Sequence, residues 1–224
     1  MSPAFAPRLD ILPPPQRRLW DELSAVPVAF TLYGGTAIAL QLGHRVSVDF
    51  DFFSFRALDP GALTLAIPFL ADANVTQREP NTFSCTLDRG GPVKLSFFGV
   101  PKLRNVLPAL AAPGNGLRVA ALLDLAAAKV RVVQTRAEAK DYFDVDAILR
   151  LSEITLPMAL AAARSIYGPQ LNPQVSLKAL AYFDEGDLMT LPRALKDRLA
   201  RAVGAVDLDA LPSIEAAIAR AQLS

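Results

Sequence analysis

The chain changes its hydrophobic pattern near Leu117, and this change constrains the fold more than any other feature of the sequence. Before it, apolar and alternating runs such as Val28 to Tyr33 and Val46 to Phe53 are typical of strands. After it, apolar residues recur at helical spacing, and Gly and Pro separate the segments. The sequence therefore predicts an α+β domain over residues 1–116, followed by a helical domain over residues 117–224.

Local signals place the elements within these domains. Prolines open the first helix, Gly43 closes the second, Asn172 caps a later one, and Asp88 to Pro92 predicts a hairpin turn. Pro113-Gly-Asn-Gly suits a linker between the domains. The expected strands cover residues 28–33, 46–53, 75–78, 83–87, 93–98 and 117–119. The expected helices cover residues 13–26, 36–42, 59–70, 122–135, 139–151, 156–166, 173–183, 191–203 and 212–222.

The composition excludes several classes of protein. Lys and Arg number 23 against 22 Asp and Glu, which disfavours a generally basic nucleic-acid binder. With one cysteine, Cys85, and one histidine, His44, the chain has neither an intramolecular disulfide nor a Cys/His zinc site. Charges interrupt the apolar stretches well short of a membrane span, and the N-terminus lacks the apolar run of a signal peptide. We therefore expect a cytoplasmic protein with no membrane partner.

Two features of the first domain carry chemistry. Gly34 and Gly35 end a predicted strand and open a predicted helix, where bare backbone N–H groups and the positive helix end favour phosphate. After a spacer of 13 residues, Asp49 and Asp51 alternate along a predicted strand and therefore project from one face. Paired carboxylates of this kind hold hard divalent cations such as Mg²⁺. Two such ions could activate an attacking hydroxyl and stabilise departing pyrophosphate.

These motifs resemble a known group. A hydrophobic residue, Gly-Gly, a spacer and Asp-hydrophobic-Asp-hydrophobic resemble the signature of polymerase-β-type nucleotidyltransferases. More narrowly, the segment from Tyr33 to Phe53 is similar to the first two motifs of the AbiEii/AbiGii toxin family of bacterial abortive-infection nucleotidyltransferases. The family's downstream Lys and Lys/Arg-Asp motifs and a tail feature resemble Asp124 to Lys129, Arg136, Lys140 to Asp144 and Leu180 to Asp184. The resemblance covers Thr31 to Leu191.

The resemblance implies a polymerase-β-like fold with a mixed sheet and a toxin that transfers a nucleoside monophosphate from an NTP to an acceptor hydroxyl. Mg²⁺ or Mn²⁺ would be the cofactor, and a cognate antitoxin would be a partner. The acceptor in toxin-like relatives can be an RNA such as tRNA, but the balanced charge leaves a protein or small-molecule acceptor open.

The resemblance also implies roles for individual residues. Gly34, Gly35 and Thr36 would cradle the triphosphate, with Arg45 adding a charge-assisted contact. The catalytic residues would be Asp49 and Asp51, which would bind the metals, and Lys129 and Asp141, which would line the nucleotide site from the helical domain.

One position departs from the pattern. A third carboxylate usually lies on a later strand of this fold, and the fourth residue of Val93-Lys-Leu-Ser-Phe, Ser96, takes that place. A serine is a poor metal ligand and cannot serve as the same base. Asp88 or a substrate phosphate could compensate. Otherwise the chain would be a catalytically weak member of the fold that binds a nucleotide or a partner protein as a regulatory module.

Simpler interpretations of the same residues remain open. Asp-x-Asp also occurs in haloacid-dehalogenase phosphatases and glycosyltransferases, but Phe53 departs from the former and neither explains Gly34-Gly35. Lys129 and Arg136 lie seven apart, as they would on a solvated helix face, and Asp141 could simply form an ion pair. We expect His44 to be a packing residue and Cys85 to be buried in its strand.

Overall fold

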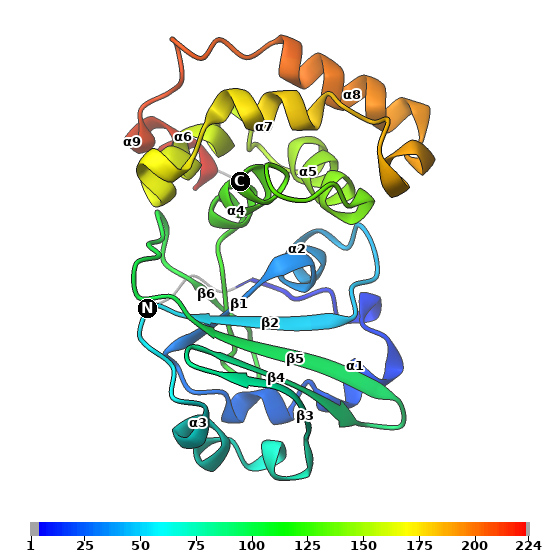
Figure 1. The fold of residues 1–224 in the computed structure, drawn as a ribbon, viewed down its shortest axis with the longest axis vertical. Coiled ribbons are helices and arrows are strands. Elements are labelled where there is room, and N and C mark those ends of the chain that lie inside the picture. The colour runs from blue at the N-terminus through cyan, green and yellow to red at the C-terminus, as the bar shows by residue number, and fades with distance from the viewer. Residues whose placement is uncertain (1–4, 223–224) are drawn as a thin grey trace. The chain divides into compact units, whose positions relative to one another are not determined.

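The computed structural model describes residues 5–222 and divides into two compact units (Figure 1). The N-terminal unit comprises Met1–Leu103 and Pro108–Ala121, and the helical unit comprises Arg104–Leu107 and Leu122–Ser224. The boundary expected after residue 116 falls inside a hairpin of the N-terminal unit. An α+β unit followed by a helical one is the predicted fold class.

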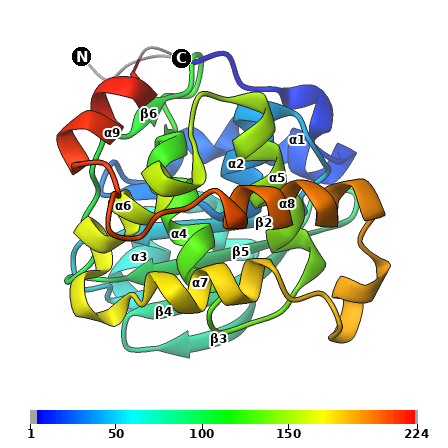
Figure 2. The same ribbon diagram turned by 90° about the horizontal axis from the view of Figure 1, so that it is seen from above.

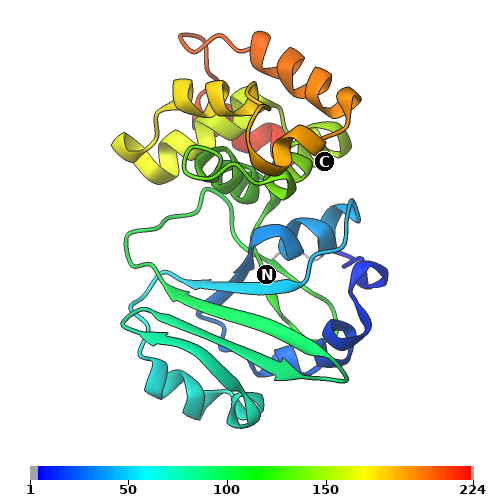
Figure 3. The same ribbon diagram turned by 45° about the vertical axis from the view of Figure 1, so that its right-hand side comes forward.

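The N-terminal unit contains a mixed sheet (Figure 3). Its seven strands lie in the order β3-β4-β5-β2-β1-β7-β6. The pairs β1–β7 and β2–β5 are parallel and the others antiparallel. The strands are β1 (Phe30–Tyr33), β2 (Asp49–Ser54), β3 (Asn74–Glu79), β4 (Thr82–Asp88), β5 (Pro92–Gly99), β6 (Leu110–Ala111) and β7 (Arg118–Val119). The helices are α1 (Pro14–Leu19), α2 (Gly34–Leu42) and α3 (Pro60–Ala66), with 3₁₀ turns η1 (Leu9–Ile11), η2 (Glu22–Ala25) and η3 (Pro68–Asp72).

The alternation of β2 separates the two faces of the sheet. Phe50 and Phe52 are fully buried, whereas Asp49 and Asp51 are partly exposed. The ring of Phe97 on β5 packs against Phe52 with a centroid distance of 4.9 Å. Burying an aromatic side chain of this size contributes about 1.5–3 kcal/mol, so this face anchors the core and leaves the other for polar groups.

The prediction that Pro113 to Gly116 link the two units is wrong, because this segment lies within the N-terminal unit. The Ala112 N–H donates to the Leu117 carbonyl and the Gly116 N–H to the Ala112 carbonyl, both at 2.9 Å, which closes the β6–β7 hairpin. The side chain of Asn115 also donates to the Trp20 carbonyl at 2.9 Å. The segment is therefore part of the N-terminal unit.

The helical unit contains α4 (Leu122–Val132), α5 (Ala139–Leu151), α6 (Leu156–Tyr167), α7 (Pro173–Leu180), α8 (Arg193–Gly204) and α9 (Ile214–Ala221), with 3₁₀ turns η4 (Gly168–Gln170) and η5 (Gly186–Thr190) (Figure 2). Helix α4 packs against α5 and α6, and α8 contacts α5 and α7. Asn172 caps α7 as predicted, because its side chain accepts the Gln174 N–H at 3.0 Å. Across residues 5–222, every helix is too short or too polar to cross a lipid bilayer.

Candidate functional site

The predicted motif forms a tight junction in which β1 leads directly into α2. Helix α2 begins at Gly34, whose φ of +74° favours glycine. A Cβ at this position would lie 2.9 Å from the Asp51 Oδ2 atom. The absence of a side chain therefore allows the Asp51 carboxylate to lie against the first turn of α2, where the positive end of the helix favours anions.

The sheet register aligns Asp51 with three side chains on the same face. Tyr33 pairs with Asp51, Asp51 with Ser96, and Ser96 with Ser84. The Ser84 and Ser96 side chains are buried, and their hydroxyl oxygens lie 3.3 Å apart in a hydrogen bond. The predicted position of Ser96 beside the aspartate pair is confirmed.

Two further residue pairs between β2 and β5 flank the pair formed by Asp51 and Ser96. Asp49 pairs with Lys94, whose side chain is exposed. On the other side Phe53 pairs with Phe98, and their ring centroids lie 5.0 Å apart. The same face thus presents a cation, hydroxyls and an aromatic ring in order along β5.

These residue pairs form one side of a hollow of about 690 Å³ over β2, β5, β4 and β3. We name it the strand pocket. Its lining residues all belong to the N-terminal unit and are Asp51, Thr76, Gln77, Glu79, Ser84, Thr86, Lys94, Ser96 and Phe98. The pocket begins at Asp51 and extends away from Gly34 toward β3, because β2 lies between β1 and β5 in the sheet.

Thr36 connects α2 to the start of β2. Its side chain is fully buried, and its hydroxyl donates to the Asp49 carbonyl at 2.5 Å and shares a hydrogen bond of 2.9 Å with the Ser47 hydroxyl. These bonds engage the side chain within the protein. The Thr36 group that stays available to a ligand is therefore its backbone N–H, one of the first donors of the helix.

Arg45 lies beside Gly35. A Cβ built on Gly35 would overlap the Arg45 guanidinium and lie 3.0 Å from the Ser47 hydroxyl oxygen. One guanidinium nitrogen donates to the Val46 carbonyl at 3.0 Å. The predicted phosphate-binding residues Gly34, Gly35, Thr36 and Arg45 therefore come together around the first turn of α2.

The donor set for a metal is small. Among residues 5–222, the structure contains no group of three or more His, Cys, Asp or Glu side chains arranged to hold a metal ion. Asp88 does not take the third place: it pairs with Pro92 and its carboxylate accepts the Gly91 N–H at 2.8 Å in the hairpin turn. Asp49 and Asp51 still suit Mg²⁺, because this ion commonly takes one or two carboxylates together with substrate phosphates and water.

Three predicted residues of the second block, Lys129, Asp141 and Asp144, form a buried cluster within the helical unit, and the exposed Arg136 contacts it. The Lys129 ammonium lies 2.6 Å from a carboxylate oxygen of Asp141 and 2.6 Å from one of Asp144. The Arg136 Nε atom donates to Asp141 at 2.8 Å. Both aspartates are fully buried. Burial raises the pKa of Asp141, but hydrogen bonds and charge from Arg136 and Lys129 outweigh it and hold the pKa below the usual value.

Comparison with known proteins identifies the group to which the chain is related. The family model described as the nucleotidyl transferase AbiEii toxin of type IV toxin–antitoxin systems matches residues 18–220. The chain belongs to the AbiEii family. It is a nucleotidyltransferase toxin of this type IV family, and the resemblance inferred from the motifs is confirmed.

Two further similarities extend the comparison. The chain is 28% identical over 165 residues to the uncharacterized protein aq_aa25 of Aquifex aeolicus (strain VF5), covering 70% of this chain and 74% of that protein. It is similar in fold to MenT4, the nucleotidyltransferase toxin Rv2826c of Mycobacterium tuberculosis H37Rv. That match has a TM-score of 0.60 at 18% identity and covers 94% of this chain and 91% of MenT4.

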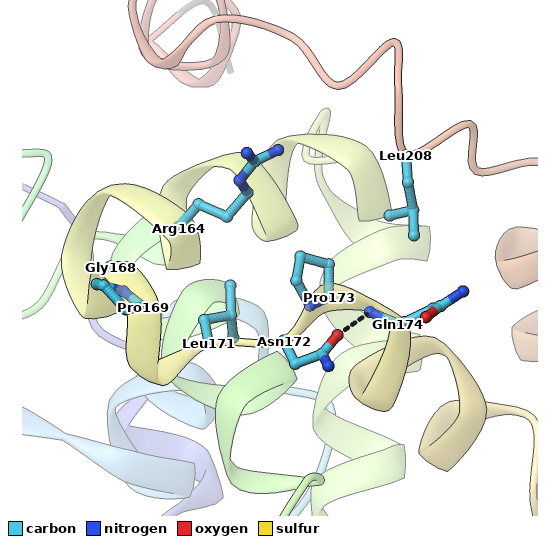
Figure 4. Close-up of a pocket in the computed structure, with 8 residues that line it drawn as sticks. All are labelled: Arg164, Gly168, Pro169, Leu171, Asn172, Pro173, Gln174 and Leu208. Carbon is cyan, nitrogen blue, oxygen red and sulfur yellow. Dashed lines mark hydrogen bonds between the residues drawn. The ribbon is translucent and has the colours of Figure 1, made fainter.

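A separate hollow of about 670 Å³ lies in the helical unit of this AbiEii chain (Figure 4). Its lining residues include Arg164, Leu171, Asn172 and Leu208. In Figure 4 the Asn172 side chain makes the capping bond to Gln174. None of the residues assigned from the AbiEii motifs lines this hollow.

Local sequence patterns do not single out Lys94, Phe98, Ser84 or Thr86. In the structure Lys94 pairs with Asp49 and Phe98 with Phe53, and Ser84 and Thr86 lie one strand further away on β4. The alternation of β5, in which Lys94, Ser96 and Phe98 lie between buried Val93, Leu95 and Phe97, is the signal that marks its polar face. Their proximity to the aspartates depends on strand pairing across more than 40 residues, which local patterns do not contain.

Proposed function

We propose that this AbiEii chain transfers a nucleoside monophosphate from an NTP to an acceptor hydroxyl, using Mg²⁺ or Mn²⁺. The observation that carries the proposal is the position of the Asp51 carboxylate against Gly34 at the start of α2. A helix end that would bind phosphate thus lies beside a carboxylate that would bind the metal, which supports NTP chemistry at this point.

The first turn of α2 would bind the triphosphate. Gly35 and Thr36 would contribute backbone N–H groups that have no acceptor within the helix, and Gly34 would leave room for the phosphate oxygens. Arg45, beside Gly35, would add a charge-assisted hydrogen bond.

Asp49 and Asp51 would hold the divalent cation together with phosphate oxygens of the NTP. The bound ion would neutralise charge on the phosphates as the reaction proceeds. In the transfer step, the acceptor oxygen forms a bond to the α-phosphorus while the bond from this phosphorus to the pyrophosphate oxygen breaks. Asp51 would accept the hydroxyl proton, which then passes to water, and pyrophosphate leaves with the electron pair of the broken bond.

Lys129 and Asp141 belong to the catalytic set in this proposal through their resemblance to the family motifs. Their mutual ion pair supports a positioning contribution, since it fixes α4 against α5 within the helical unit. A folded variant at Lys129 that loses transfer would support this assignment.

The partners follow from the family. An RNA such as tRNA, a protein or a small molecule can supply the acceptor hydroxyl, and an antitoxin is the expected protein partner of a type IV toxin. Ser96, which pairs with Asp51, favours a second candidate function. Because Ser96 takes the position where a third carboxylate would complete the metal site, the chain would then be a weakly catalytic module that binds a nucleotide or a partner protein.

The test is label transfer from each α-³²P NTP, with Mg²⁺ or Mn²⁺, to total RNA or to protein in a lysate. We expect label in one acceptor fraction and at least about a hundredfold less with Asp51→Asn, because a metal ligand is lost. Asp21→Asn, which changes an exposed carboxylate of the same unit, should transfer as the parent does. NTP binding without transfer from any NTP would support the binding module.

A further inference from the structure

We propose that residues Arg104–Leu107 form a detachable strap, which the Asp124 carboxylate holds on α4. Release of the strap reduces the covalent connections between the two units from three to one and gives the units more freedom to move. The strap is a conformational device built into the chain, and it is independent of the nucleotide chemistry proposed above.

The path of the chain gives the strap its importance. The chain leaves the N-terminal unit after Leu103, returns to it at Pro108 and leaves it again after Ala121, so it crosses between the units three times. With the strap released, Arg104–Leu107 is no longer fixed to the helical unit. The junction of Ala121 with Leu122 is then the remaining covalent connection. A single junction can act as a hinge, whereas three junctions restrain rotation.

The N-terminal sheet does not require the strap to stay in place. The strap lies within residues 100–109, which join β5 to β6. These two strands are four positions apart in the sheet, or about 19 Å at roughly 4.8 Å per position. The ten residues of the connection can extend about 33 Å. The strap can therefore leave α4 while both strands keep their partners.

One side chain supplies the polar attachment of the strap. The Asp124 carboxylate accepts the Val106 N–H at 2.8 Å and the Leu107 N–H at 3.1 Å. Within residues 5–222, these two are the strap's hydrogen bonds to the rest of the helical unit. The Leu107 side chain is also buried, but the strap contains no helix or strand. A segment with so few attachments opens at a lower free energy than the core.

The same carboxylate makes docking of the strap depend on pH. Burial raises the pKa of Asp124 to about 6, against the opposing effect of the two N–H donors. Release exposes the carboxylate to water in the first turn of α4, where the positive end of the helix favours an anion. The stabilisation of the docked strap is therefore complete below the ordinary pKa of 3.8 and is lost as the pH rises through about 6.

The ionisable groups around Asp124 keep one charge state over this range. Tyr167 on α6 interacts with the Asp124 charge, and its pKa is raised to about 12, mainly by burial. Arg131 on α4 acts on Tyr167 in the opposite direction, and Arg104 in the strap is exposed. Arginine stays charged and this tyrosine stays neutral from about pH 4 to about pH 8. Asp124 is thus the group that changes charge where the strap docks.

Hydrogen exchange of the Val106 and Leu107 amides, measured by NMR on the full chain, tests the attachment. Their protection factors should fall roughly twentyfold between pH 4.5 and pH 7.5 in the parent, as Asp124 ionises. Asp124→Asn does not ionise and should give a flat profile, whereas Asp124→Ala should lose about tenfold in protection. Asp209→Asn, at an exposed position, should follow the parent. The Ala112 amide of the β6–β7 hairpin should keep its protection in every variant, which shows that the fold is intact.

Limited digestion with trypsin gives a second measurement, because Arg104 lies in the strap. At pH 7.5 cleavage after Arg104 should be about tenfold faster in Asp124→Ala than in the parent, since cleavage follows the population of the open segment. Cleavage after Lys178, which is exposed on α7, should occur at the same rate in both proteins.

Nitrogen-15 relaxation tests the effect on the two units. Their rotational correlation times should differ more in Asp124→Ala than in the parent, because one junction rather than three joins them. Full protection of Val106 and Leu107 in Asp124→Ala, or a flat pH profile in the parent, would show that Asp124 does not hold the strap. Lost protection with unchanged correlation times would show that the strap does not restrain the units. Either result overturns the inference, and neither depends on NTP binding.

Discussion

The N-terminal and helical units each hold a cluster of charged residues, but the two clusters differ in burial and in ion pairing. On the sheet, Asp49 and Lys94 are register neighbours on a partly open face, and no ion pair joins them among residues 5–222. In the helical unit, Lys129 lies 2.6 Å from both Asp141 and Asp144, and all three side chains are buried. The first arrangement leaves charge available to a ligand, whereas the second neutralises its charge within the protein.

The difference follows from the geometry of the two elements. Strand alternation places Asp49 and Asp51 on one face of β2, where both side chains stay partly exposed although Asp51 lies against the first turn of α2. Helical spacing places Asp141 and Asp144 one turn apart, so one lysine from α4 can contact both. A motif with acidic and basic residues therefore does not by itself indicate a ligand site, because the sequence does not reveal which charges are buried together within the protein.

Removing Lys129, the cation of the buried cluster with Asp141 and Asp144, should give the largest change in stability. Lys129→Met leaves two buried carboxylates with less compensation, so the free energy of unfolding should fall by about 3–5 kcal/mol. Urea unfolding followed by circular dichroism measures this change. Lys178→Met, on an exposed position of α7, is the control. Adding Asp144→Asn to Lys129→Met should restore part of the loss, and no loss in the single variant would show that the cluster is not structural.

Asp124 is another buried carboxylate, and its pH dependence has the opposite sign from that of Asp141. Burial raises the pKa of Asp124 to about 6, although the Val106 and Leu107 N–H groups donate to it and oppose the shift. The stability that this group contributes is complete below its unfolded pKa near 3.8 and is lost as the pH rises through about 6. The loss amounts to about 3 kcal/mol.

Urea unfolding between pH 4.5 and 7.5 checks this expectation. The parent should lose stability relative to Asp124→Asn across that window, because the amide does not ionise. Asp209→Asn, at an exposed position of the same unit, should follow the parent. Parallel pH profiles for the parent and Asp124→Asn would contradict the assigned shift. For Asp141, whose pKa is lowered, stability is instead lost only as the pH falls below 3.8.

Gly34→Ala tests the contact between the start of α2 and Asp51, and we expect a smaller change in free energy than for Lys129→Met. The positive φ costs an alanine roughly 1 kcal/mol. Its Cβ would also displace the Asp51 carboxylate, because it would lie 2.9 Å from the Asp51 Oδ2 atom. We expect about tenfold weaker Mg²⁺-dependent NTP binding in calorimetry. At Gly35 an added Cβ would meet mainly the flexible end of Arg45, so Gly35→Ala should have the lesser effect. Equal losses would show that the approach of Asp51 to Gly34 is unimportant.

The sequence predicted the elements with strong local signals. The alternation around Asp49 and Asp51 located β2, the glycines located the turn into α2, and α5 has the predicted bounds Ala139–Leu151. Two-residue β6 was missed because it has too few residues to show a period, and the hairpin after it was taken for a linker. The site was predicted only as far as one motif extends: Lys94 and Phe98 depend on the pairing of β5 with β2.

The central claim is that Asp49 and Asp51, the latter lying against Gly34, bind an NTP with its metal. Calorimetric titration of the full chain with a non-hydrolysable NTP analogue, at increasing Mg²⁺, tests it most directly. The account predicts that Mg²⁺ strengthens binding by the parent and by Asp21→Asn, and that Asp51→Asn loses this dependence while retaining its unfolding temperature. Mg²⁺-dependent affinity that is equal in the parent and Asp51→Asn would contradict the claim.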